Sequence, residues 1–256
     1  MSYLPSAVGV FLCVAFVGSS VAQTVVNPAE FANKEGRRQS AGGVERPASV
    51  LPDQHTRAQF IYHNSTFSTV ASGPIRITEI NLRPDGARDV GDEQGYENLR
   101  LVLAVTSSTP QEASTSFADN LANITSEPIV VFDQPWESEV VNPVPAEGTR
   151  PFDFRIQLTE PFVFDPSEGH LMVDWFFGRP TNLGPHTNFD SDAVFGEPPT
   201  EFPEQQGVFA LGDDPIGNGG QIVPTQFVFE PVPEPTLRLG TVLFVVGLAS
   251  RFRKRK

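Results

Sequence analysis

An acidic stretch of the sequence offers the kind of side chains that bind calcium. Residues 84–93 read PDGARDVGDE, and the carboxylates of this stretch are those of Asp85, Asp89, Asp92 and Glu93. Calcium takes about six to eight oxygen ligands on a loop that can bend around it. The spacing differs from that of an EF-hand, and Arg88 adds a competing charge. A solvated hairpin loop is the simpler interpretation, and a calcium ion bound here is expected to stabilise the fold rather than to catalyse.

A second acidic segment has the composition of a tight turn. Residues 165–169 read DPSEG, in which an Asp-Pro pair is followed three residues later by Gly169. The carboxylate of Asp165 can accept bonds from nearby backbone N–H groups, and a glycine can take a positive φ angle. We predict a structural turn here in preference to an acidic ligand-binding loop.

Motifs for catalysis are missing from the sequence. The histidines are His55, His63, His170 and His186, and none has the spacing of HExxH; there is no G-x-S-x-G elbow and no P-loop. The carboxylates of a glycosidase could still meet in space among the 31 acidic residues. Two classes therefore stay open: a non-catalytic binding or structural module, and a secreted carbohydrate-active enzyme.

An exposed aromatic ring could serve either class as a platform for sugars. Trp175 has the same parity as neighbouring apolar residues, so we expect it in the core. Trp136 follows Pro135 and is the candidate sugar platform.

The elements that must position these residues are strands. Apolar and polar residues alternate with period two over 99–106, 152–158 and 171–177, and shorter strands are expected at 59–62, 129–132, 207–211 and 227–230. A change of parity after Ile77 predicts a bulge near Thr78 and Glu79. The 21 glycines and 24 prolines separate the strands as turn residues. We therefore predict an all-β protein, with one β-sandwich or jelly-roll-like domain over 55–230. Residues 23–54 are expected to form a flexible lead-in, and residues 179–206 a long surface loop.

The first residues are typical of a secretory signal. An apolar run at 7–17 is followed by Ser20-Val21-Ala22, which offers small residues where a signal peptidase reads. The run lacks a preceding Lys or Arg, and it is too short to cross a membrane. We predict that residues 1–22 are removed, and Cys13, the single cysteine, with them.

The last residues combine three features. Pro233-Glu234-Pro235 is followed by a short apolar segment and then by a basic end. A helix over 237–249 would span about 20 Å, against a bilayer core of about 30 Å, so it suits a transient stop-transfer segment. The basic cluster would stay on the cytoplasmic side. The residues of this membrane tail are Leu237, Leu239, Leu243, Phe244, Val245, Val246, Leu248, Arg251, Arg253, Lys254, Arg255 and Lys256.

Residues 231–256 thereby resemble the PEP-CTERM sorting signal of Gram-negative bacteria, although Arg238 and the shortness of the apolar run depart from the pattern. The resemblance implies that signal peptidase and exosortase process the chain. It also implies a transient contact with the inner membrane, followed by delivery to the cell surface or to the extracellular polysaccharide matrix.

The body is similar to uncharacterised bacterial domains that are often joined to such tails. The resemblance covers about residues 58–177 and implies a β-sandwich without implying an activity. The matching residues are Phe117, Asn120, Pro161, Phe162, Asp165, Pro166, Gly169 and Leu171.

The charge of the chain restricts its partners. It carries 31 acidic and 18 basic side chains, a formal net charge of −13. Such a surface repels nucleic acid and anionic lipid. We therefore expect no nucleic-acid partner, and name an extracellular polysaccharide as the possible ligand.

Overall fold

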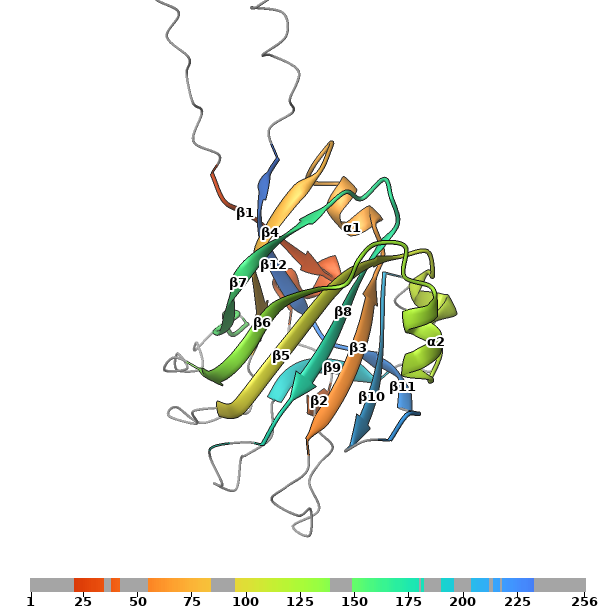
Figure 1. The fold of residues 1–256 in the computed structure, drawn as a ribbon. Helices are drawn as coiled ribbons and strands as arrows, with labels where there is room; N and C mark the ends of the chain where they lie inside the picture. Colours follow the sequence, from red (N-terminus) through yellow and green to blue (C-terminus); the bar gives the residue numbers. More distant parts are fainter. Residues whose placement is uncertain are drawn as a thin grey trace, which may run out of the picture.

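The computed structural model describes residues 21–34, 38–41, 55–83, 95–138, 149–179, 181, 190–195, 204–211, 214–216 and 218–232 (Figure 1). The strands are β1 (Gln23–Asn27), β2 (Arg38–Ala41), β3 (Thr56–Tyr62), β4 (Ile75–Leu82), β5 (Gly95–Thr106), β6 (Ile129–Glu137), β7 (Phe154–Phe164), β8 (His170–Phe177), β9 (Asp190–Phe195), β10 (Gln205–Leu211), β11 (Asn218–Ile222) and β12 (Thr225–Pro231). The short helices are η1 (Ala29–Ala32), α1 (Ser65–Ser68), η2 (Pro110–Glu112) and α2 (Phe117–Ala122).

The strands form two antiparallel sheets, which confirms the all-β prediction. The smaller sheet has the order β1-β12-β4-β7, and the larger has the order β2-β9-β11-β10-β3-β8-β5-β6. Figure 1 shows the smaller sheet behind the larger one, with α2 beside the larger sheet. One continuous apolar cluster contains side chains of both sheets, so the fold is sandwich-like.

Period-two alternation explains how each sheet contributes to this cluster. In β7, Phe154, Ile156 and Leu158 are buried, whereas Arg155 and Gln157 between them are exposed. The inward parity of β3, β5 and β8 is equally apolar, and Trp175 is 1% exposed, as expected. Because successive side chains point to opposite faces, the other parity of these three strands must lie on the outer face of the larger sheet.

The predicted bulge is present in β4. Its pairing with β7 shifts register between Ile77 and Glu79, and its pairing with β12 shifts at the same point. Thr78 is the extra residue, and its hydroxyl donates to the carbonyl of Val228 (3.3 Å). An extra residue reverses the parity of the strand beyond it, which explains why Ile77 and Ile80 can both be buried.

Two segments expected to be irregular contain strands. The lead-in at 23–54 includes β1, which pairs with β12, and β2, which pairs with β9. The surface loop at 179–206 includes β9, which also pairs with β11. Residues 23–26 are exposed or half-buried, because β1 is an edge strand, and so the segment lacks the strong apolar alternation of a central strand.

Trp136 lies in the core, so the prediction of a surface sugar platform is wrong. Its side chain is 6% exposed and packs against Tyr96 and Phe154. Its Nε1 donates to the carbonyl of Arg155 on β7 (3.0 Å). Pro135 beside it is tolerated because β6 is an edge strand, where a missing N–H costs no ladder bond. The indole therefore joins β6 to the other sheet instead of facing solvent.

The turn predicted at 165–169 is confirmed. Oδ1 of Asp165 accepts bonds from the backbone N–H (2.9 Å) and the hydroxyl (2.7 Å) of Ser167. Gly169 has a φ of 151°, which side chains rarely adopt. A Cβ atom at this position would lie 2.7 Å from the carbonyl oxygen of Thr106. The turn carries the chain from β7 in the smaller sheet to β8 in the larger one.

Several sequence predictions fall outside the described residues. They concern most of the signal segment, the acidic stretch Asp85, Asp89, Asp92 and Glu93, and the tail from Pro233 onward. Within the described ranges, no helix is long and apolar enough to cross a membrane.

We predict that Gly169→Ala lowers the free energy of unfolding by about 2 kcal/mol, because it combines a strained φ with a clash against Thr106. Chemical denaturation measures the change. Gly73→Ala is the matched control, since a Cβ there would meet nothing within 4 Å. Equal stability of the two variants would contradict the role assigned to Gly169.

Candidate functional site

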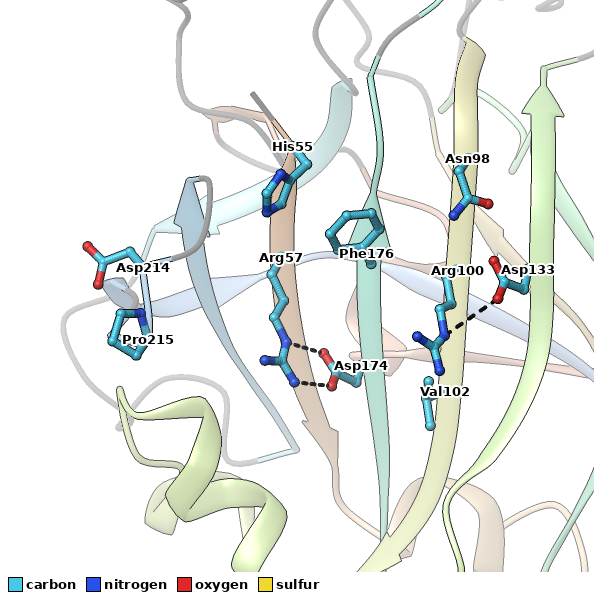
Figure 2. A pocket seen from close by; sticks show the side chains of 10 residues that line it. All are labelled: His55, Arg57, Asn98, Arg100, Val102, Asp133, Asp174, Phe176, Asp214 and Pro215. Atoms are coloured by element: carbon cyan, nitrogen blue, oxygen red, sulfur yellow. Dashed lines mark hydrogen bonds and ion pairs between the residues drawn. The ribbon is translucent and has the colours of Figure 1, made fainter. Parts of the chain in front are cut away.

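The outer face of the larger sheet carries a groove of about 590 Å³ (Figure 2). Its size lies within the range of roughly 300–1,000 Å³ that is typical of small-ligand sites. The groove is polar, with one partly exposed aromatic ring. It is lined by His55, Arg57, Asn98, Arg100, Val102, Asp133, Asp174, Phe176, Asp214 and Pro215.

Strand register places four of these side chains in one row. Arg57 of β3 and Arg100 of β5 are both directly opposite Phe176 of β8, and Asp133 of β6 is opposite Arg100. Directly opposed side chains in antiparallel strands lie about 5 Å apart at Cβ. Phe176 is therefore flanked by two arginines in this row, and Figure 2 shows its ring turned toward His55, while the side chains of Arg57 and Arg100 extend the other way. The ring of His55 lies 4.8 Å from that of Phe176.

Arg57 and Asp174 form a two-bond ion pair at one side of this row. Nε of Arg57 donates to Oδ1 (3.0 Å) and Nη2 donates to Oδ2 of Asp174 (2.5 Å). Nε2 of Gln59 donates to the same Oδ2 (3.2 Å). The hydrogen bonding of Arg57 to Asp174 raises the pKa of Arg57, desolvation by burial opposes this shift, and the negative charge of Asp174 adds to it. The pair is a rigid wall of the groove, because a bidentate guanidinium–carboxylate contact fixes both side chains.

Helix α2 is held against this wall. The guanidinium of Arg57 lies over the ring of Phe117, 4.7 Å from its centroid. Asn120 donates to Oε1 of Gln59 (3.1 Å) and accepts from the backbone N–H of Ser114 (2.8 Å). Phe117 and Asn120 are thus anchors of α2 on the outer face of the sheet.

The segment at 214–216 forms the rim beside α2. The backbone N–H of Phe117 donates to the carbonyl of Pro215 (3.4 Å), and Ser116 forms a β-bridge with Ile216. Oδ1 of Asp214 accepts from the backbone N–H of Ile216 (3.0 Å). The carboxylate of Asp214 therefore helps to hold the rim in its turn.

The opposite side of the groove is looser. Nε of Arg100 and Oδ2 of Asp133 are 3.7 Å apart, and both side chains are about half exposed, at 48% and 47%. This distance is too long for a direct hydrogen bond. The pair presents N–H donors and carboxylate acceptors side by side to a ligand.

Sequence reasoning did not single out this groove. The alternation over 99–106 places Arg100 and Val102 on one face of their strand, but the order β3-β8-β5-β6 that assembles the row is not predictable from single strands. The acidic stretch 84–93 and the sorting residues Pro233, Glu234 and Pro235 lie outside the described residues. Among the described residues, no group of three or more His, Cys, Asp or Glu side chains could hold a metal ion.

Two histidines lie together at another place, where β3 ends and β8 begins. The ring centroids of His63 and His170 are 4.5 Å apart. Nδ1 of His170 accepts from the backbone N–H of Asn64 (3.2 Å), and Nδ1 of His63 accepts from that of Ser65 (3.2 Å). Each ring therefore accepts a backbone hydrogen bond at Nδ1. Burial, followed by the charge of His63, lowers the pKa of His170, and Glu112 opposes this shift.

We predict that Arg57→Met lowers the free energy of unfolding by about 2 kcal/mol, because it leaves the mostly buried carboxylate of Asp174 without its main donor. Arg100→Met is the matched control and should cost at most about 0.5 kcal/mol, since its pair is long and exposed. Urea unfolding compares them. An equal loss in both variants would show that the Arg57–Asp174 pair holds no more of the fold than a surface contact.

We predict that acid weakens the fold through His170. Its folded pKa is below the unfolded value of about 6.5, so the unfolded chain takes up the proton more readily. The contribution is complete above that pH and is lost as the pH falls from about 6.5 through the folded pKa. His170→Gln should reduce the difference in unfolding free energy between about pH 7.5 and about pH 5, which lie on either side of the unfolded pKa. An unchanged difference would exclude His170 as the source.

Comparison with known proteins adds no assignment to this geometry. No family model, curated protein or solved structure matches the chain. The groove and the two ends of the sequence are therefore the features from which a function can be inferred.

Proposed function

We propose that this is an exported bacterial surface or extracellular-matrix protein whose β-sandwich-like domain binds polysaccharide without catalysis. The groove on the outer face of the larger sheet is the observation that carries the proposal. It combines planar polar side chains with a partly exposed aromatic ring, which is a composition suited to a ligand that has both hydroxyl groups and an apolar ring face.

Binding is favoured over glycoside hydrolysis by the state of the carboxylates in the groove. Asp174 accepts three bonds from Arg57 and Gln59, Asp133 is paired with Arg100, and Asp214 accepts from the backbone of the rim. A glycosidase needs one carboxylic acid that gives up its proton and a second carboxylate on the other side of the bond. Asp174 and Asp214, already engaged as hydrogen-bond acceptors, are poorly placed for the first task, and Asp133, 3.7 Å from Nε of Arg100, would lack a second available carboxylate in the groove.

The geometry of the ends supports a role in display. Gln23, the residue after the expected signal cleavage, pairs with Phe229 near the end of β12, so β1 begins where β12 ends (Figure 1). At the same end of the domain, Pro231 of β12 pairs with Ile75 of β4, which in turn pairs with Phe164 of β7. Phe164 is followed by the turn that leads into the start of β8. Phe176 lies near the other end of β8. A domain held by either end would thus present the groove away from its attachment.

The sorting proposal rests on the resemblance of 231–256 to a PEP-CTERM signal. We expect protein recovered from the cell surface to be shortened at both ends when its intact mass is measured. Replacement of Pro233, Glu234 and Pro235 by alanine should leave the protein in the inner membrane, because exosortase would no longer process it. Parent protein of full length that stays in the inner membrane would contradict the proposal.

The binding proposal is tested by screening the purified protein on a polysaccharide array, with parallel assays for released sugar. Binding without release is the expected result. Release of sugar fragments would establish the secreted carbohydrate-active enzyme instead. Absence of both binding and release would leave display without a polysaccharide ligand.

A further inference from the structure

We infer that the ligand of the groove is a neutral polysaccharide, one pyranose ring of which lies on Phe176 while its hydroxyls bridge Arg100 and Asp133. This inference rests on the proposed function and adds the chemical class of the ligand and the residues that select it. It also moves the sugar platform from Trp136, which is buried, to Phe176, which is half-buried in the groove.

Phe176 occupies the central position of the groove. It belongs to the outward parity of β8, on which Asp174 is its neighbour along the strand. The arginines opposite it on both sides direct their guanidinium groups toward carboxylates (Figure 2). The aromatic ring is thus an apolar surface surrounded by polar side chains. The C–H face of a sugar ring can cover it without burying a polar group unpaired.

The loose pair of Arg100 and Asp133 matches the needs of hydroxyl groups. A hydroxyl both donates one hydrogen bond and accepts others, so it is best satisfied by a donor and an acceptor together. The 3.7 Å separation of Nε and Oδ2 leaves both atoms short of a direct bond with each other. A sugar hydroxyl that accepts from Arg100 and donates to Asp133 would complete both. The tight Arg57–Asp174 pair cannot open in this way, and therefore serves as the wall.

The charge of the groove excludes acidic polysaccharides. Its lining contains three carboxylates, from Asp133, Asp174 and Asp214, against the two guanidinium groups of Arg57 and Arg100. The chain as a whole has a formal net charge of −13. A uronate or sulfate group would meet arginines that already have carboxylate partners, in a field that repels it. A neutral chain meets no such penalty, and its binding should depend little on salt.

The test uses the purified full chain in mild detergent, with affinity electrophoresis in gels that contain a defined polysaccharide. Dextran, laminarin and galactomannan are the neutral probes, and alginate and polygalacturonate are the anionic ones. Phe176→Leu keeps apolar volume but removes the flat ring, and Arg100→Met removes the donor. Arg76→Met, an exposed change on β4 of the other sheet, is the matched control. Thermal unfolding confirms that each variant is folded.

The expected result is binding of at least one neutral probe that is insensitive to salt and about tenfold weaker in both groove variants, with the control unchanged. Binding of anionic probes alone, weakened by salt, would overturn the ligand class and leave polysaccharide binding intact. Neutral binding that both groove variants retain would overturn the assignment to Phe176 and Arg100. Failure of all probes to bind would overturn polysaccharide binding, and this inference with it, whereas the sorting proposal is tested separately by intact mass.

Discussion

The contact between the two sheets is the constraint on which the rest of the structure depends. Burying the inward parity of β3, β5 and β8 against the smaller sheet requires that the other parity faces outward. The polar character of the groove follows from this requirement, since Arg57, Arg100 and Asp174 each alternate with buried residues. The same burial that stabilises the domain therefore creates its candidate binding surface.

The outer face is divided into two parts by the segment that follows β5. Near the start of β8, Ile61, Ala104 and Met172 are covered by apolar residues around α2. Toward the end of β8, the face stays open as the groove. Arg57 lies at the boundary, because it contacts Phe117 of α2 and forms the wall with Asp174. Stability of α2 and shape of the groove are thereby coupled through one guanidinium group.

Side-chain hydrogen bonds connect the two sheets at one pair of edge strands. On one side, Trp136 of β6 and Thr159 of β7 each donate to a backbone carbonyl of the opposite sheet. These bonds join the edge strands of the two sheets across the core. Trp136 and Phe176 are both aromatic residues of the larger sheet, but they face opposite ways. Trp136 points inward and joins the two sheets, whereas Phe176 points outward into the groove.

Local sequence determined the features that depend only on neighbours along the chain. The alternation in β5, β7 and β8, the bulge at Thr78 and the turn from Asp165 to Gly169 were all predictable, because side-chain period and backbone freedom are local properties. The expected sorting signals at the two ends are likewise linear patterns.

Tertiary structure decided which strands become neighbours and which side chains meet. Alternation tells which face a residue takes within its strand, but not which strands become neighbours. Arg57 and Asp174, 117 positions apart, meet only because β3 pairs with β8. The parity of Trp136 was obscured by register shifts between β5 and β6. The strands β1 and β9 were missed for a related reason, since an edge or short strand is stabilised by its partner's hydrogen bonds more than by its own pattern.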